Sequence, residues 1–335
     1  MKKSLLGILV AAAFANGAFA QTNVTIYGIV DAGISHDNNG GAAGSVTRLD
    51  SGILNGGRLG FMGTEDLGGG LSASFQLENG FGVDNGALGQ GGRLFGRQAW
   101  LGVNGGFGSV RLGRQMTPVF ANSPTFDPFV DALAGDTGRL FNYSGARVDN
   151  ALSYNYDANG IRAQLMYGFG ETAGNTSANR TIAGFTGYKN GPLDVVLTYT
   201  GTNDATGNVT GKTTMLGGNY NFGPAAVYAT YAWNKDVVAP SGVVAAGADT
   251  RNALLGVTVP FGSGTFKASW IKLSDKATAN ADANQIAVGY VYDLSKRTAL
   301  YTSFSRTAND SGAKYNTDTG GATDKLFDVG MRHKF

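Results

Sequence analysis

Residues 71–78 read Leu-Ser-Ala-Ser-Phe-Gln-Leu-Glu, and every second side chain in this stretch is apolar. Successive side chains of a β-strand point to opposite faces, so Leu71, Phe75 and Leu77 share one face while Gln76 lies on the other. The same period of two recurs at 161–169, 193–200, 227–234 and 327–335. The pattern predicts strands of about ten residues, each with one apolar and one polar face.

The connections between these strands fall into two length classes. Short turns rich in Gly, Asn and Asp, which tolerate the positive φ of tight hairpins, lie at 65–69, 104–106, 157–160, 189–192, 221–224, 261–264 and 293–296. Longer polar stretches lie at 36–56, 79–93, 117–146, 170–179, 201–211, 235–249, 274–283 and 308–324. Seven turns and eight loops join sixteen strands. Such an even number, with short turns at one rim and long loops at the other, is typical of outer-membrane barrels.

The sequence therefore predicts an all-β fold, a transmembrane antiparallel β-barrel of 16 strands that forms one domain over residues 21–335. A secreted β-sandwich is the alternative, because its strands also alternate and its turns are also rich in glycine. A sandwich gives no reason for the two length classes of connection.

The first twenty residues have the pattern of an export signal. Lys2 and Lys3 precede a short apolar run at 5–15, and Ala18-Phe19-Ala20 matches the small-x-small cleavage site. The run is shorter than the ~20 residues that a spanning helix needs. We expect residues 1–20 to be removed by cleavage. This removes two of the chain's 26 basic residues and leaves equal numbers of basic and acidic residues. A chain without net positive charge gives no support for a nucleic-acid partner.

The side-chain inventory argues against an enzyme. The chain has no cysteine and only two histidines, His36 and His333, far apart in the sequence. No Gly-x-Ser-x-Gly motif, phosphate-binding loop or metal-spaced histidine pair is present in the sequence. We therefore expect no catalytic residues, no metal site and no cofactor.

Several motifs carry a resemblance to a known family. They are Tyr-Gly-Ile-Val-Asp-Ala-Gly at 27–33, Arg-Leu-Gly-Phe at 58–61 with Glu-Asp-Leu-Gly at 65–68, Phe-Gly-Arg-Gln-Ala-Trp-Leu-Gly at 95–102, and Gly-Arg-Gln at 113–115. This ordered set resembles the general trimeric porins of Gram-negative outer membranes, betaproteobacterial branch, over essentially the whole chain. Phe335, at the end of an alternating strand, resembles the assembly signal of outer-membrane proteins, although His333 stands where that signal often has Tyr.

The resemblance implies a location and a set of partners. It implies export through the periplasm to the outer membrane and assembly as a homotrimer among outer-membrane lipid and lipopolysaccharide. It also implies passive diffusion of small hydrophilic solutes and ions through a water-filled channel, and a third long loop, here 117–146, folded into the lumen.

The lumen should carry the mid-strand charges, because a base that faces lipid costs on the order of 2–4 kcal/mol. On that ground Arg58, Arg97 and Arg162 are expected inside. In the resembled family, a basic wall faces acidic residues on the third loop, and the matching basic positions are Arg58, Arg97 and Arg147. Further candidates, which a solvated rim position would equally explain, are Arg93, Arg111, Arg114 and Arg139. Alternation places Arg111 and Arg114 on opposite faces of one strand.

Loop 117–146 supplies the acidic candidates. We expect its apolar side chains to pack against the inner wall, leaving Asp127, Asp131 and Asp136 to the lumen. Between residues 93 and 147, six Arg stand against three Asp, and this imbalance predicts a weak anion preference. The alternative function is a channel specific for a sugar or an anion. For sugars it would need a stacking track of aromatic residues, for which the candidates are Tyr154, Tyr156, Tyr228 and Tyr301.

Overall fold

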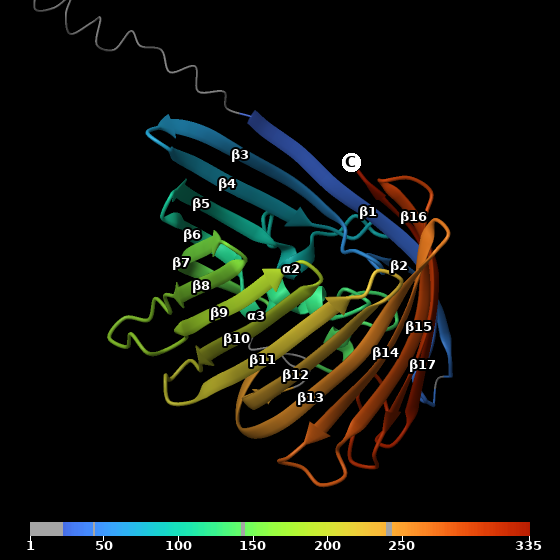
Figure 1. Ribbon diagram of the computed structural model, residues 1–335. Helices are drawn as coiled ribbons and strands as arrows, with labels where there is room; N and C mark the ends of the chain where they lie inside the picture. Colours follow the sequence, from blue (N-terminus) through green and yellow to red (C-terminus); the bar gives the residue numbers. More distant parts are fainter. Residues whose placement is uncertain (1–22, 43, 142–144, 239–242) are drawn as a thin grey trace, which may run out of the picture.

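The computed structural model describes residues 23–42, 44–141, 145–238 and 243–335 (Figure 1). The predicted export signal, residues 1–20, lies outside the described residues. No helix in the described part of the chain is long and apolar enough to cross a membrane.

Within the described ranges, seventeen strands form an antiparallel sheet that closes on itself. The strands are β1 (Asn23–Asn38), β2 (Val46–Ser51), β3 (Arg58–Gly68), β4 (Leu71–Gly80), β5 (Gln98–Gly105), β6 (Gly108–Met116), β7 (Arg147–Ala158), β8 (Ile161–Gly168), β9 (Thr181–Asn190), β10 (Leu193–Asn203), β11 (Thr210–Asn221), β12 (Ala226–Val238), β13 (Val243–Phe261), β14 (Gly264–Asp275), β15 (Ala283–Asp293), β16 (Thr298–Asn309) and β17 (Thr323–Lys334). The short helices α2 (Gly89–Gly92) and α3 (Pro118–Asn122) lie in connections between strands.

The second strand of the barrel is split in two. One half of β1 pairs with β2 and the other half with β3, so β2 and β3 together cross the barrel once, with a break at 52–57. The molecule is therefore a closed barrel of 16 strands, and the predicted fold class is confirmed. The barrel closes where β1 pairs with β17, and Gly28 and Phe335 exchange two backbone hydrogen bonds of 3.1 Å at the end of that seam.

Short turns and long connections gather at opposite rims, as predicted, but some predicted loops are shorter in the structure. Parts of 36–56 are strand, because β1 continues to Asn38 and β2 covers Val46–Ser51. Likewise β12 continues to Val238 and β13 begins at Val243, inside the predicted loop 235–249. Residues within these predicted loops pair with neighbouring strands, because backbone hydrogen bonds do not require a regular alternation of side chains. A prediction based on polarity alone therefore makes these loops longer than they are in the structure.

The two faces of the wall differ as the alternation predicts. Apolar side chains point outward, and Leu165 is the extreme example with 70% of its surface exposed. Inward positions such as Thr198, Thr200 and Gln285 are polar and buried. The barrel thus offers an apolar outer surface and a polar lining.

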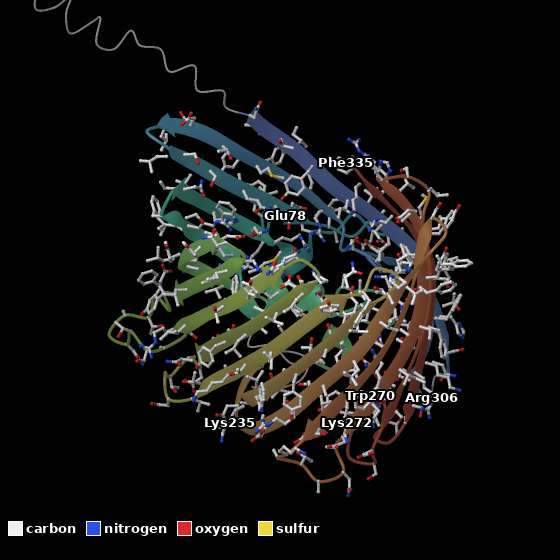
Figure 2. All side chains as sticks on the ribbon, in the orientation of Figure 1. Glu78, Lys235, Trp270, Lys272, Arg306 and Phe335 are labelled. Atoms are coloured by element: carbon white, nitrogen blue, oxygen red, sulfur yellow. The ribbon has the colours of Figure 1, made fainter. Side chains whose placement is uncertain are left out.

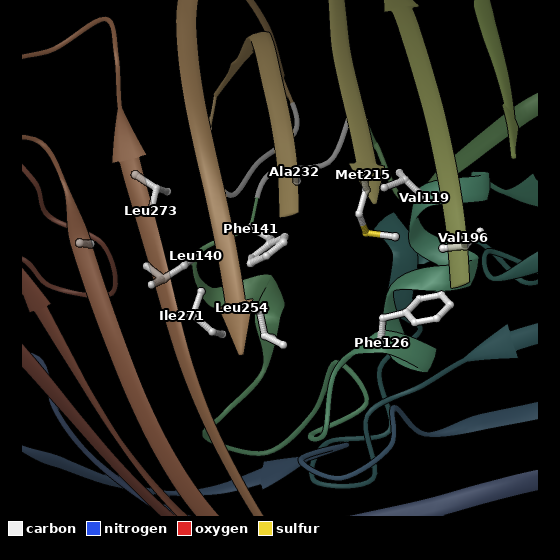
Figure 3. Packing of buried hydrophobic residues seen from close by; sticks show 11 residues of the cluster. Val119, Phe126, Leu140, Phe141, Val196, Met215, Ala232, Leu254, Ile271 and Leu273 are labelled. Carbon is white, nitrogen blue, oxygen red and sulfur yellow. The ribbon is translucent and has the colours of Figure 1, made fainter. Parts of the chain in front are cut away.

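The main apolar core lies between the wall and a connecting loop. Val119, Phe126, Leu140 and Phe141 come from the connection between β6 and β7, and they pack against inward-facing side chains of the wall. Figure 3 shows these loop residues beside Val196, Met215, Ala232, Leu254, Ile271 and Leu273, which come from β10–β14. The connection is therefore bound to the inner wall.

Candidate functional site

Loop 117–146 is built from short capped turns. The Thr117 hydroxyl accepts a hydrogen bond of 3.3 Å from the Phe120 amide and so caps α3, which has proline at its first position. Two 3-10 turns follow, η1 (Ser123–Phe126) and η2 (Thr137–Arg139). Asp136 caps the second turn by accepting a hydrogen bond from the Gly138 amide at 2.6 Å. The loop thus has its own local structure before it meets the wall.

Three inward-facing glycines receive the loop. A Cβ atom at Gly217 of β11 would lie 2.7 Å from the Phe126 ring, and one at Gly256 of β13 would lie 2.4 Å from Pro128. At Gly289 of β15, the corresponding distance to the Phe129 ring is 3.0 Å. These positions lie on alternate strands, and together they form a track without side chains along which the loop lies, here called the glycine track.

Polar contacts fix the loop along this track. Thr230 donates to the Phe126 carbonyl at 3.0 Å, and Asn252 donates to the Leu140 carbonyl at 2.9 Å. At the far side, the Ala134 amide donates to the Ser303 hydroxyl at 2.8 Å, and the Leu133 amide donates to the carbonyl of Ile53 at 2.7 Å. The loop is therefore held at both ends of its path across the barrel.

The three predicted acidic residues do not meet the basic wall. Asp127 accepts hydrogen bonds from the amides of Phe129, Asp131 and Thr137, at 2.8, 3.0 and 3.3 Å. Asp131 accepts from the hydroxyls of Ser123, at 2.9 Å, and Thr137. Among the described residues, none of the three carboxylates forms an ion pair. The expectation that these carboxylates face the wall arginines is therefore wrong. The turns of the loop bury backbone N–H groups that need hydrogen-bond acceptors, and the carboxylates accept hydrogen bonds from them.

Burial within the loop also changes the acidity of these groups. It raises the pKa of Asp127 to about 6. Burial, together with the charges of Asp127 and Asp136, raises the pKa of Asp131 above its usual range. Burial raises the pKa of Asp136 as well. The loop therefore holds three carboxyl groups whose pKa values are higher than those of ordinary surface acids, so they take up protons at higher pH.

The structure brings Arg58, Arg97 and Arg147 together on the wall. The charge of Arg97 acts on both Arg58 and Arg147, so the three guanidinium groups lie near one another. The Arg147 guanidinium donates to the carbonyl of Arg97 at 2.9 Å and lies over the Phe120 ring, 5.2 Å from its centre. These three residues are here called the arginine cluster.

The carboxylate of this cluster belongs to the wall. Glu78 of β4 forms an ion pair of 2.7 Å with Arg97 and accepts a hydrogen bond of 2.9 Å from the Tyr27 hydroxyl. Its side chain is 4% exposed and that of Arg97 is 12% exposed. In the alternating stretch 71–78, Glu78 shares the polar face of Gln76, but the alternation does not reveal its partner. A buried carboxylate in the middle of a strand needs a basic or hydrogen-bonding partner, and this requirement could have identified Glu78 from the sequence.

The remaining predicted arginines have other partners, although Arg114 lies close enough to Arg147 for its charge to act on that residue. Arg111 faces inward over Trp100, 4.3 Å from the ring centre, whereas Arg114 occupies the opposite face and pairs with Asp149. Arg93 pairs with the same Asp149 at 2.8 Å. Arg139 belongs to the loop and pairs with Asp324 of β17, so it anchors the loop instead of lining the wall. Arg162 faces inward and pairs with Asp194 near the short-turn rim.

A second basic group was missed by the sequence analysis. Lys267 of β14 donates to the Pro128 carbonyl at 2.6 Å, and Arg332 of β17 donates to the Asn55 side chain at 3.0 Å. Lys334 lies within reach of the charges of both Arg332 and Arg58. These bases line a cavity of about 610 Å³ against the loop, with Lys296 and one acid, Asp293. Arg332 and Lys334 alternate with Met331 and Phe335 in the sequence, and this alternation is the signal that could have placed them in the lumen.

Comparison with known proteins identifies the family. A model of the Gram-negative porin family matches residues 7–312. The outer membrane porin protein 32 of Delftia acidovorans and an outer membrane porin protein of Bordetella pertussis are each 34% identical, with 100% of both chains covered. The major outer membrane protein P.IB of Neisseria meningitidis is 30% identical over the same share of both chains.

Solved structures agree with this result. The anion-selective porin from Comamonas acidovorans has a TM-score of 0.83 and 31% identity, covering 94% of this chain and 100% of its own. A trimer form of OmpT from Vibrio cholerae, with a TM-score of 0.70 and 18% identity, covers 94% of this chain and 99% of its own and shares the fold. With a family match over most of the sequence, relatives along its full length and a closed barrel, the chain belongs to the Gram-negative porins of the outer membrane, which are channels and not enzymes.

Proposed function

We propose that the protein is a channel for passive diffusion of small hydrophilic solutes and ions, with a weak preference for anions. The observation that carries the proposal is the charge of the lumen. Arg58, Arg97 and Arg147 share one carboxylate, Glu78, while the three loop carboxylates are turned into the loop. The second basic group extends the positive charge along the same side of the lumen.

The mechanism involves no reaction. A positive wall across a narrow aperture with low-dielectric surroundings raises the local concentration of anions and lowers that of cations. Guanidinium groups suit such a wall because they stay charged when like charges crowd them, which a lysine does less reliably. Size is selected by the loop on its glycine track, and charge is selected by the bases that face it.

A reversal-potential measurement tests this proposal. Purified protein in a planar bilayer, with a KCl gradient, should give conductance steps and a modest potential of the sign set by chloride. The double variant Arg58→Gln and Arg147→Gln should move that potential toward zero. Arg180→Gln in the connection between β8 and β9 is the matched control and should leave it unchanged. A cation-sign potential in the unaltered protein would refute the anion preference, and absent steps would refute an open channel.

A channel specific for sugars is less well supported. Tyr154 and Tyr156 are 40% and 38% exposed on the outward face of β7, where they cannot meet a solute in the lumen. Tyr228 and Tyr301 face inward, but Tyr301 is buried and donates a hydrogen bond of 2.7 Å to Asp31. The four tyrosines therefore do not line one track.

The proposal includes a homotrimer, set among outer-membrane lipid and lipopolysaccharide. Its support is the family and the trimer form described for the OmpT structure. Native mass spectrometry of the purified protein tests it, and a monomer under mild detergent would contradict it. We also propose removal of residues 1–20, which predicts Gln21 as the first residue of the mature protein on N-terminal sequencing.

We further propose that Phe335 serves as the assembly signal. Its backbone bonds with Gly28 complete the seam between β1 and β17, and its ring occupies the space above Gly28. Phe335→Ala should reduce the amount of folded protein in the outer membrane, measured as the fraction with altered gel migration before heating. Met331→Ala, on the same outward face, is the control for loss of apolar surface alone.

A further inference from the structure

Two pairs of like charges stand directly opposite each other on the outer wall. Lys212 of β11 is the register partner of Lys235 of β12, and Arg306 of β16 is the register partner of Lys325 of β17. All four side chains are exposed. Opposite residues in antiparallel strands have Cβ atoms about 5 Å apart, and like charges at that spacing are destabilising. These two basic pairs thus lower the stability of the protein alone.

The basic pairs lie outside the barrel at the rim of the long connections. Lys235 shares its face with exposed Tyr231 and Trp233. On β17, Lys325 and Phe335 share the outward face ten residues apart. At about 3.3 Å per residue and ~40° tilt, this separation spans about 25 Å of height, the full apolar band of an outer-membrane barrel. Figure 2 shows Lys235 and Arg306 at the end opposite Phe335.

That rim faces the outside of the cell, because outer-membrane barrels place their long loops there. The pairs therefore lie where the apolar band meets the head groups of the outer leaflet. Bases at such a border attract anionic head groups.

Within the described ranges, these bases have no acidic partner. In the part of the chain that the structure describes, none of the four forms an ion pair. Asp249 of β13 is the register partner of Lys235 on its other side, but its carboxylate pairs with Arg251. A phosphate between two opposed bases would convert their repulsion into two charge-assisted hydrogen bonds.

An apolar groove lies below each basic pair. Below Lys212 and Lys235, a groove of about 680 Å³ begins at the facing residues Leu216 and Tyr231 and continues past Gly218. Its edge is four residues, about 13 Å, down the strands from the pair.

Below Arg306 and Lys325, a groove of about 460 Å³ begins at the facing residues Phe304 and Phe327. Its edge is two residues, about 7 Å, down the strands from that pair. The same order, a basic pair above an apolar groove, thus occurs twice on the barrel wall.

We infer that the two basic pairs are binding sites for the phosphates of lipopolysaccharide, whose acyl chains lie in the grooves beneath. The inference deepens the lipid partner of the proposed function by naming its residues. It rests on the outer-membrane location but not on the anion preference of the pore. The ligand joins phosphate groups to several acyl chains, which matches the charge at the rim and the apolar area below it.

Thermal unfolding in lipid-free detergent tests the inference, using the full chain with and without purified lipopolysaccharide. The variants are Lys212→Gln with Lys235→Gln, Arg306→Gln with Lys325→Gln, and all four changes together. The matched control is Lys296→Gln with Arg297→Gln, which removes two bases from the short-turn rim. Lipopolysaccharide should raise the melting temperature of the unaltered protein and of the control. Each pair removed should weaken binding about tenfold, and the fourfold variant should show no shift.

The lipid-free measurement separates a binding role from a structural one. Without lipopolysaccharide, the double variants should melt at the same temperature as the unaltered protein or higher, because repulsion is removed. Gly218→Leu, which fills the larger groove without a change of charge, should also weaken binding. A Cβ at Gly218 has its closest contact at 3.5 Å, so the backbone there accepts a side chain.

Three outcomes would overturn the inference. One is an equal lipopolysaccharide shift in the unaltered and fourfold proteins, and another is an equal shift from dephosphorylated lipopolysaccharide. The third is a shift in melting temperature from phosphatidylglycerol that equals the shift from lipopolysaccharide and is likewise lost when the basic pairs are removed. That result would assign the pairs to anionic phospholipid. The reversal potential of the fourfold variant, measured in parallel, reports separately on the proposed channel function and should match that of the unaltered protein.

Discussion

Single residues set the charge of the lumen, and Glu78 matters most among the acids. Among the described residues, its carboxylate is the one that forms an ion pair with the arginine cluster, through Arg97, and it also accepts a hydrogen bond from the Tyr27 hydroxyl. Glu78→Gln keeps an acceptor for Tyr27 but removes the negative charge. The anion preference should increase, seen as a larger reversal potential of the chloride sign. Stability should fall, because the largely buried Arg97 side chain loses its ion-pair partner.

The control for this change is Asp194→Asn, which removes a lumenal carboxylate paired with Arg162 near the short-turn rim. Since that pair lies away from the aperture, its loss should alter the reversal potential less. A shift of the Glu78 variant toward cations would contradict the assigned role.

Asp127 gives the loop a dependence on pH. Burial raises its pKa to about 6 from the ordinary 3.8, so the folded loop binds this proton more tightly than an unfolded one. Stability of the loop should therefore rise as pH falls from 7 through about 6, with the gain complete below the ordinary pKa. Hydrogen exchange of the Phe129 and Asp131 amides, corrected for intrinsic rates, measures it. Asp127→Asn should reduce the dependence, and an opposite slope in the unaltered protein would exclude it.

The orientation of these loop acids marks the limit of prediction at the residue scale. Alternation within strands assigned Arg111 and Arg114 to opposite faces, because a strand has a fixed period. The loop has no such period, and its side chains are aimed by the hydrogen-bonding needs of its own turns. Asp127 therefore could not be oriented from the sequence, although its presence in the loop could be read directly.

Among the elements, the strands were predictable and their ends were not. Alternating stretches such as 193–200 gave the correct outward face. The ends of β1 and β12 were missed because polar strand residues above the membrane resemble loop residues. The path of loop 117–146 depends on Gly217, Gly256 and Gly289, which stand far apart in sequence and come into line only when β11–β15 pair side by side.

The glycine track makes a prediction about loop position. Gly217→Leu would place side-chain atoms where the Phe126 ring now lies, 2.7 Å from the new Cβ. The loop should move toward the pore axis, which should lower single-channel conductance and increase current noise. Thr186→Leu on the outward face of β9 adds a similar side chain toward lipid and serves as the control. An unchanged conductance in a folded Gly217 variant would show that the track does not position the loop.

At the scale of the whole molecule, selectivity should depend on salt. The bases of the lumen act on passing ions through a field that is screened within about 10 Å at 0.1 M salt and about 3 Å at 1 M. At a fixed concentration ratio, the reversal potential should therefore decrease as mean KCl concentration rises. Measurements at several mean concentrations check this, and a constant potential would mean that ions are selected by direct contact.

The number of strands and the closure of the barrel were available from the sequence because they follow from counting alternating segments and turns. The second basic group was not assigned, because its members come from β14 and β17 and gather only where the loop crosses the wall. Proximity between distant strands is a property of the closed barrel, and no local pattern encodes it.

The split second strand ties the aperture to the order in which the molecule is completed. At the break between β2 and β3, Ile53 accepts the Leu133 amide of the loop, while Ser303 and Asp324 hold the same loop from the other end of the chain. These attachments thus come from both the first and the last parts of the polypeptide, whereas the glycine track lies on the middle strands. In a sheet whose edges have not yet joined, the loop would lie on the glycine track without all of these attachments, so the final aperture forms only when the barrel closes.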